Sequence, residues 1–298
     1  MQGARCRFRC TLHPVSLLHH YTISPLHHFT ITPLHHFIIP MTFTYITITY
    51  NAVSTVSPTL ESILRQQYPQ IEHIIVDGAS TDATLDLVRR YQEASRASGN
   101  GHTVRIVSEP DKGIYDAMNK GLALATGDYV CFLNAGDSLP EELQVSAIAD
   151  MLQQRCGDQD LPAVVYGDTN LVDEDRRLIG RRRLSPPERL TWRSFASGML
   201  VCHQSFYARR NLAQQMPYNL AYRHSADFDW CIRVMKAAVG ERPFLNTRMV
   251  LTNYLNEGHT TKNHRASLLE RYHIMCGYYG TLPTIIRHIG FLFRNVAK

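Results

Sequence analysis

Short runs of β-branched and aromatic residues alternate with segments of helical periodicity between residues 42 and 133. The runs predict four strands, over Thr42–Thr49, Ile71–Val76, Val104–Val107 and Tyr129–Leu133. The segments between them place apolar residues three or four positions apart, as helices with one buried face do. This alternation through short connections is typical of an α/β fold with a mostly parallel central sheet and helices on both faces.

Polar residues stand directly after the predicted strands. Crossovers in parallel sheets are right-handed, so the loops after the strands share one edge, and ligands bind at that carboxyl edge. We therefore expect a ligand site that draws on all four strand ends. Its candidate residues are Thr49, Tyr50, Asn51, Asp77, Asp111, Lys112, Asn119, Asn134 and Asp137.

Taken singly, these groups have simpler explanations. Asp77 and the small residues after it also fit turn and cap chemistry, and Asp137 could cap a helix over Leu139–Leu152. A carboxylate at the end of a buried strand also suits a hard divalent cation, which would neutralise charge on a diphosphate. The gathering of four such groups at one edge favours the ligand site.

Composition narrows the class of protein. The 298 residues carry a formal net charge of +5, which suits an anionic ligand or a membrane surface without indicating nucleic acid. The seven cysteines include no CxxC pair, so we expect free thiols and a cytoplasmic protein rather than disulfides or a zinc cluster. No apolar run is long enough to predict a membrane span.

The first forty residues contain an octad repeat, LHHYTISP-LHHFTITP-LHHFIIP. Prolines at positions 25, 33 and 40 break any helix, although paired histidines also occur in metal sites. We interpret residues 1–40 as a disordered repeat and Met41 as the native start. This segment is therefore left out of the fold prediction.

Beyond residue 160 the pattern is less regular. We predict strands over Ala163–Tyr166 and Met199–Cys202, a charged loop over Asp173–Arg183 and a helix over Ser225–Ala238. Residues 261–298 predict a C-terminal helical tail. Its last helix has apolar residues beside basic ones, which fits either packing on the domain or peripheral contact with a membrane.

The segment SEPDKGIYDAMNKGLALATGDYVCFLNAGD, residues 108–137, resembles the family 2 glycosyltransferases with a GT-A fold, in the subgroup that builds bacterial surface polysaccharides. The resemblance covers roughly residues 42–260, and we divide it into a donor half (41–155) and an acceptor half (156–260). It implies that Asp77 contacts the nucleotide base and that Asp111 lies at the donor site. It also implies that Asp137 is the metal-binding end of a DXD-type motif, for Mg²⁺ or Mn²⁺.

The acceptor half carries further matches. His203 and Gln204 resemble a pair that lines the acceptor site, although His203 also fits a buried structural histidine. By the same resemblance Asp227 is the general base, Asp229 is a weaker acceptor-site candidate, and His259 completes the metal site or touches the diphosphate. For His259 an ordinary loop position is the simpler alternative.

The resemblance implies an inverting transfer of a hexosyl group from a nucleotide sugar, UDP- or GDP-linked, to a hydroxyl of a glycan or lipid-linked acceptor. Two positions depart from the family pattern: Gly78 stands where a second aspartate is common, and the DXD region reads NAGD with one carboxylate. A non-catalytic scaffold on a decayed transferase fold is one alternative. A nucleotidyltransferase is another, but the loop after the first strand has no glycine or lysine.

Overall fold

The computed structural model describes residues 40–156, 161–238, 244–256 and 264–296, all within the unit Ile39–Lys298. The octad repeat up to residue 39, and His259, lie outside these residues. The strands are β1 (Phe43–Thr49), β2 (Ile71–Asp77), β3 (Thr103–Ser108), β4 (Tyr129–Phe132), β5 (Val164–Val172), β6 (Leu178–Arg181), β7 (Phe206–Arg209) and β8 (Leu245–Leu255). The α-helices are α1 (Val56–Leu64), α2 (Thr84–Ser98), α3 (Ile114–Leu124), α4 (Gln144–Cys156), α5 (Arg210–Gln215), α6 (Ala226–Ala237), α8 (His264–Tyr279) and α9 (Thr281–Val296). Two short 3₁₀ helices are η1 (Trp192–Ser197) and η2 (His203–Ser205).

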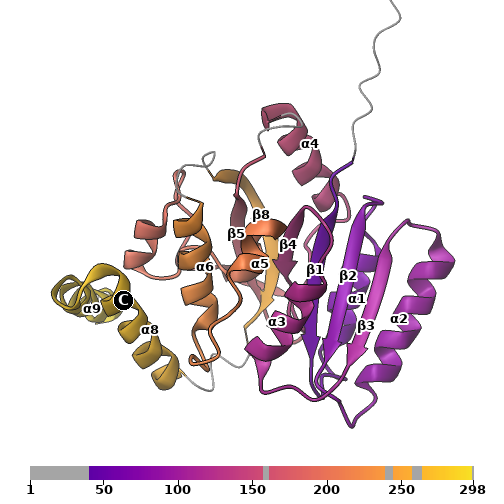
Figure 1. Cartoon of the computed structure of the whole chain (residues 1–298), viewed down its shortest axis with the longest axis horizontal. Coiled ribbons are helices and arrows are strands. Elements are labelled where there is room, and N and C mark those ends of the chain that lie inside the picture. The colour runs from indigo at the N-terminus through magenta and orange to yellow at the C-terminus, as the bar shows by residue number, and fades with distance from the viewer. Residues whose placement is uncertain (1–39, 157–160, 239–243, 257–263, 297–298) are drawn as a thin grey trace, which may run out of the picture. The chain divides into compact units, whose positions relative to one another are not determined.

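The described strands form one sheet in the order β3-β2-β1-β4-β7-β5-β6, with β8 paired to β5 (Figure 1). The pairs among β3, β2, β1 and β4 are all parallel, as the alternating pattern predicts. β7 runs antiparallel to β4 and β5, and β8 runs parallel to β5. The fold is therefore the expected α/β arrangement, with parallel strands β1–β4 in residues 41–155 and mixed pairing in residues 156–260.

Both faces of the sheet are covered by helices (Figure 1). In β1, where every residue is buried, Phe43 and Tyr45 pack in a core with α1, α2 and α4. Ile46 and Ile48 point to the other face and pack in a second core with α3, α5 and α6. Burial on both faces explains why apolar residues of β1 point to both sides of the sheet rather than to one side only.

Two expected elements of the acceptor half are wrong. Met199–Cys202 is not a strand: it connects η1 to η2, and its apolar side chains are buried by packing rather than by strand pairing. Residues Asp173–Arg183 are not all loop, because β6 forms there as the antiparallel partner of β5. β6 is largely exposed, so it lacks the apolar pattern by which strands are recognised.

The segment after Asp137 also differs from the simple prediction. The helix expected over Leu139–Leu152 begins only at Gln144, so Asp137 does not cap it. Thr59 holds the turn instead: its hydroxyl donates to the Asp137 carbonyl and accepts from the Gly136 N–H. The cap interpretation of Asp137 is therefore excluded, and its carboxylate is left for another role.

Helices α8 and α9 pack on each other and on η1. α8 also contacts the segment that precedes α6, through hydrogen bonds of Glu270 and Ser267. Within the described part of the chain, no helix combines the length and the apolar character that crossing a membrane requires. The five cysteines in this part are all free, as expected.

Candidate active site at the carboxyl edge of the sheet

Asp77 ends β2 at the carboxyl edge and organises the loops around it. Its Oδ1 accepts hydrogen bonds from the hydroxyls of Thr49 (3.0 Å) and Ser80 (2.5 Å). Its Oδ2 accepts from the Ser80 N–H (2.9 Å) and the Ser108 hydroxyl (2.8 Å). Burial raises the pKa of Asp77, but these hydrogen bonds outweigh burial and hold that pKa below its ordinary value. The carboxylate is thus ionised and ties together the ends of three strands.

Asp111 lies beside Asp77 at the same edge. A Cβ added at Gly78 would stand 2.5 Å from Asp111 Oδ2 and 3.3 Å from the Tyr50 ring. The Asp111 carboxylate therefore fills the space that a second aspartate at position 78 would need, which is a physical reason for the glycine. Tyr50 is 66% exposed next to these groups. Three predicted donor residues are thus brought together at the ends of β1, β2 and β3.

Asn51 and Lys112 lie on the loops of this edge. The backbone of Asn51 has a positive φ of 48°, its N–H donates to Ser80, and its Oδ1 accepts from the Thr81 N–H. Asn51 therefore joins the loops after β1 and β2. Lys112 is exposed at the start of α3, with its backbone N–H bonded to Asp116.

Asp137 follows β4 and is 3% exposed. Its Oδ1 accepts from the Leu255 N–H (3.0 Å) and its Oδ2 from the Gln204 side-chain amide (3.0 Å). Burial raises the pKa of Asp137 to about 6, although these two hydrogen bonds act in the opposite direction. Gln204, predicted for the acceptor site, thus contacts the residue predicted to hold the metal.

Whether these residues fit a divalent ion can be judged from their free oxygen atoms. The side-chain oxygen of Asn134 is buried and has no hydrogen-bond partner among the described residues. From the described residues, each Asp137 oxygen accepts one of the two hydrogen bonds it can take. No group of three or more His, Cys, Asp or Glu in the described residues could enclose a metal. The set fits an ion held by one carboxylate and one amide oxygen, with phosphate oxygens completing the shell.

Asp227 lies in the first turn of α6, near the carboxyl edge of the sheet. His203 Nδ1 is 3.2 Å from Asp227 Oδ2, and the Tyr115 hydroxyl donates to Oδ1 at 3.2 Å. The other ring nitrogen of His203 faces the Asn134 amide at 3.4 Å. Burial raises the pKa of Asp227, but the hydrogen bond from His203 and the charges of His203 and Arg271 hold it below its ordinary value. Asp227 is therefore an ionised carboxylate, 16% exposed, joined through His203 to the end of β4.

Two predicted residues lie outside this group. Asp229 is buried, and its carboxylate is taken by Arg233 (2.7 Å) and by the Tyr278 hydroxyl (2.7 Å). Asn119 uses its side-chain amide to hold the backbone N–H and carbonyl of Tyr218. Both side chains contact neighbouring structure rather than the strand ends.

Sequence reasoning missed three residues of the site. Tyr115 lies inside the quoted motif, but only its contact with Asp227 shows its position. Glu270, on α8, accepts hydrogen bonds from the backbone N–H groups of residues 223, 224 and 225, directly before α6. Arg271 stacks over Phe228 at 5.3 Å. Nothing in the local sequence of α8 relates it to α6.

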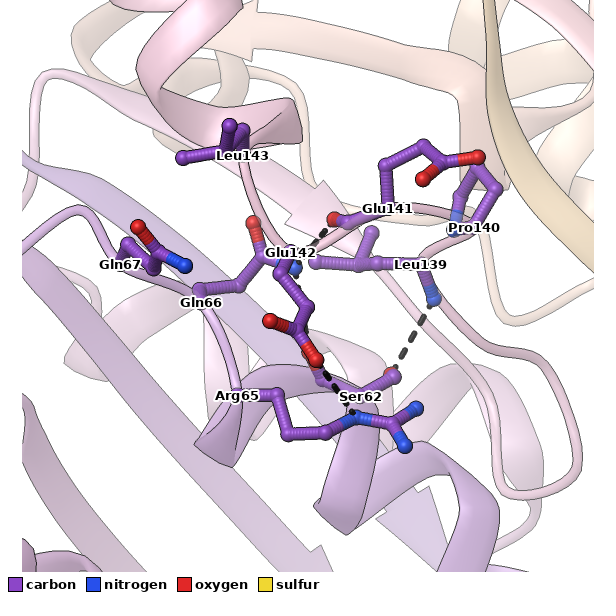
Figure 2. A pocket seen from close by; sticks show the side chains of 9 residues that line it. All are labelled: Ser62, Arg65, Gln66, Gln67, Leu139, Pro140, Glu141, Glu142 and Leu143. Carbon is purple, nitrogen blue, oxygen red and sulfur yellow. Dashed lines mark hydrogen bonds and ion pairs between the residues drawn. The ribbon is translucent and has the colours of Figure 1, made fainter.

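A separate pocket of about 440 Å³ lies between the end of α1 and the segment before α4 (Figure 2). Figure 2 shows Arg65 facing Glu142, and Ser62 accepting a hydrogen bond from the Leu139 N–H. None of the predicted site residues lines it. We place the candidate site at the strand ends because the ionised and orphaned polar groups gather there.

Comparison with known proteins identifies the family of the chain. Residues 44–216 match the family described as glycosyl transferase family 2. The PGL/p-HBAD biosynthesis glycosyltransferase of Mycobacterium bovis is 36% identical over 192 residues, covering 64% of this chain and 68% of that protein. The amylovoran biosynthesis glycosyltransferase AmsB of Erwinia amylovora is 25% identical, covering 70% of each chain.

Solved structures share the fold at low sequence identity. TarS 1-349 of S. aureus, solved in complex with UDP-GlcNAc, matches with a TM-score of 0.59 at 16% identity, over 78% of this chain and 64% of that one. A longer TarS chain is covered over only 39% of its length. The mannosyltransferase PcManGT of Pyrobaculum calidifontis, in complex with GDP-Man and Mn²⁺, matches with a TM-score of 0.52 at 18% identity, over 83% and 74% of the two chains.

The family match covers more than half of the chain, and the relatives named above are glycosyltransferases. This supports transfer of a sugar over the nucleotidyltransferase and scaffold alternatives. The chain belongs to glycosyl transferase family 2 and is a glycosyltransferase with a GT-A fold.

Proposed function

We propose that the protein transfers a hexosyl group from a nucleotide-sugar donor to a hydroxyl of a glycan or lipid-linked acceptor, with inversion at the anomeric carbon. The observation that carries the proposal is the position of Asp227. It is an ionised carboxylate held between His203 and Tyr115, and His203 connects it to Asn134 at the donor edge. A general base therefore stands beside the strand ends where the donor would bind.

The donor would occupy the edge from β3 to β4. Its nucleoside would lie near Asp77, Asp111 and the exposed ring of Tyr50, and its diphosphate near Asn134 and Asp137. A UDP- or GDP-linked sugar is the donor class we propose. The similar structures of TarS and PcManGT, which were solved with UDP-GlcNAc and GDP-Man, support this choice.

Asp137 and Asn134 would hold a Mg²⁺ or Mn²⁺ ion through their side-chain oxygens. When bound, such an ion neutralises charge that builds up on the departing diphosphate. The presence of Mn²⁺ in the PcManGT complex supports a divalent ion. His259, our other candidate for this site, lies outside the described residues.

The chemical step needs one proton acceptor and one leaving group. Asp227 takes the proton of the acceptor hydroxyl as its oxygen forms a bond to the anomeric carbon. The bond from that carbon to the diphosphate oxygen breaks, and the nucleoside diphosphate leaves with the electron pair. His203 and Tyr115 orient the Asp227 carboxylate, and positioning of the two substrates lowers the barrier further.

The acceptor would belong to surface-polysaccharide assembly, as the names of the M. bovis and E. amylovora relatives support.

Helix α9 supports a peripheral position on the inner face of the plasma membrane. It exposes an apolar stripe at helical spacing, formed by Leu282 (69%), Ile285 (38%), Ile286 (62%) and Ile289 (48%). Binding of the full chain to anionic vesicles, lost in Ile286→Asp, would test this contact.

The Asp227→Asn variant tests the proposed base. We expect transfer, measured as nucleoside diphosphate release with acceptor present, to fall by at least about a hundredfold, while nucleotide binding is kept. Asp86→Asn is a matched control because Asp86 is 71% exposed on α2. Full turnover by Asp227→Asn would remove Asp227 from the catalytic role.

A further inference from the structure

Arg271 is a partly buried cation near the proposed base, and its buried Nε has no hydrogen-bond partner among the residues that the structure describes. It projects from α8 and lies over the ring of Phe228, 5.3 Å from the ring centre. Its Nε is buried, and the guanidinium makes no hydrogen bond to any residue that the structure describes. The Asp227 carboxylate, whose charge acts on Arg271, is bonded to His203 and Tyr115 instead.

This arrangement leaves the buried Nε–H donor of Arg271 without an acceptor among the described residues. Burial lowers the pKa of Arg271 and the charge of Asp227 raises it, but an arginine side chain remains a cation. A buried donor without an acceptor costs free energy that an exposed one does not. A planar guanidinium that is already fixed in place is suited to bind a phosphate or carboxylate through two parallel hydrogen bonds.

Arg182 adds a second positive charge near enough to act on Arg271. It follows β6, its side chain donates to the Met199 carbonyl at 2.6 Å, and its charge lowers the pKa of Arg271. Two arginines that repel each other are stabilised when an anion lies between them. The surrounding segment is also strongly basic: residues 176–193 contain seven arginines and one acidic residue, Glu188.

The sheet order separates this pair from the donor edge. β3 and β2, which carry the proposed nucleoside site, stand at one end of the path β3-β2-β1-β4-β7-β5-β6. β6, which leads into Arg182, stands at the other end. Asp227 lies between, because His203 links it to Asn134 after β4 and Phe228 links it to Arg271. An anion at Arg271 would therefore belong to the molecule that approaches Asp227 from the acceptor half.

We propose that Arg271, together with Arg182, binds an anionic group of the acceptor, a phosphate or a carboxylate, and so brings the acceptor hydroxyl to Asp227. This inference rests on the proposed function, since it takes Asp227 as the base. It names the acceptor class as an anionic glycan or a phosphate-linked one. Sugars that carry the same acceptor hydroxyl but no anionic group would bind more weakly.

The test is calorimetric titration of the full chain with inorganic phosphate, and separately with acetate, after a nucleoside diphosphate has filled the donor site. We expect at least one of the two anions to bind, and the one that binds identifies the anion. Arg271→Gln should weaken this binding by about tenfold or more without changing nucleotide affinity. Arg65→Gln is the matched control, because Arg65 is 59% exposed at the end of α1. Equal anion binding by Arg271→Gln and the native chain would overturn the proposal, as would binding of neither anion.

A second variant covers the case in which Arg271→Gln does not fold. Asp227→Asn removes a negative charge close to Arg271, so anion binding should become tighter. Unchanged or weaker anion binding in Asp227→Asn would contradict the proposed anion site at Arg271.

Loss of anion binding when the nucleotide is added would place the anion in the donor diphosphate site and would also overturn the proposal. Anion binding is also measured on the nucleotide-free chain. Failure of the nucleotide to bind would therefore count against the proposed function, and it can be told apart from failure of the anion to bind.

Discussion

The Asp111 carboxylate stands where a side chain at position 78 would begin: a Cβ on Gly78 would meet Asp111 Oδ2 at 2.5 Å. The sequence already shows Gly78 as a departure from the doubled aspartate of the family. The structure gives the departure a steric meaning, because one carboxylate reaches the edge from β2 and the second reaches it from the loop after β3. The two acidic groups of the proposed donor site thus come from different segments.

A Gly78→Ala change should displace Asp111 without unfolding the protein, because the end of a side chain can move aside. We expect nucleotide affinity to fall by about tenfold, the typical loss for one charge-assisted hydrogen bond, with little change in the melting temperature. Calorimetric titration with the preferred nucleotide measures this. Gly277→Ala is the control, since its added Cβ meets no atom within 4 Å. Unchanged affinity in Gly78→Ala would remove Asp111 from the donor site.

His203→Ala should shift the pH dependence of transfer. The hydrogen bond and charge of His203 hold the pKa of Asp227 below its ordinary value against the effect of burial. Without His203 that pKa rises, so the ionised base is lost at a higher pH and the acidic limb of the kcat/KM profile moves upward. His273→Ala, an exposed change on α8, should leave the profile in place. A His203→Ala profile that coincides with the native one would show that His203 does not tune Asp227.

Glu270→Ala should lower turnover although Glu270 touches no substrate in our account. Its carboxylate accepts from three successive backbone N–H groups that lead into α6, and α6 carries Asp227. We expect a loss of about 2 kcal/mol in the free energy of unfolding and a fall in kcat with nucleotide affinity unchanged. Glu93→Ala on the exposed face of α2 is the control. A variant with native kcat would show that α8 does not position the base.

His73 should make the protein sensitive to acid. It is buried, with its ring nitrogens 2.9 Å from the Thr47 hydroxyl and 2.7 Å from the Tyr91 hydroxyl. Burial, and to a lesser extent the charge of His102, lower the pKa of His73 to about 3. The unfolded chain takes up a proton below about pH 6.5 while the folded chain does not, so stability falls as pH drops from about 6.5 towards 3.

Urea unfolding at pH 7, 6 and 5 measures this sensitivity. The His73→Gln variant is destabilised overall, but its stability should fall less steeply with acid, by up to about 1.4 kcal/mol per pH unit. His273→Gln should keep the native slope, because His273 is exposed. The same slope in His73→Gln and the native chain would refute the account of His73.

The first four strands could be predicted from sequence because each is a short run rich in β-branched, aliphatic and aromatic residues with polar residues at or just after its end. The strand ends, the position of Asp77 and the helix α3 follow from that pattern. The acceptor half could not, since β6 is exposed and the buried run Met199–Cys202 packs without pairing. Burial alone does not distinguish a strand from a connection that crosses the core.

The surroundings of Asp227 show a second limit. Its partners His203 and Tyr115 lie 24 and 112 residues away in the chain, and the Glu270 carboxylate that fixes the start of α6 comes from α8. Local periodicity carries no information on such contacts. The contact of Asn119 with Tyr218 and that of Asp229 with Tyr278 are equally remote in the chain, although Arg233, the other partner of Asp229, is only four residues away.

Calorimetric titration of the protein with UDP, GDP and dTDP, each with Mn²⁺ and with EDTA, tests the central claim that the strand ends form a metal-assisted nucleotide-sugar site. We predict that one of the three nucleotides binds in the presence of Mn²⁺, that EDTA weakens the binding, and that Asp137→Asn weakens it in the same way. Absence of binding by all three nucleotides to the folded protein would contradict the claim.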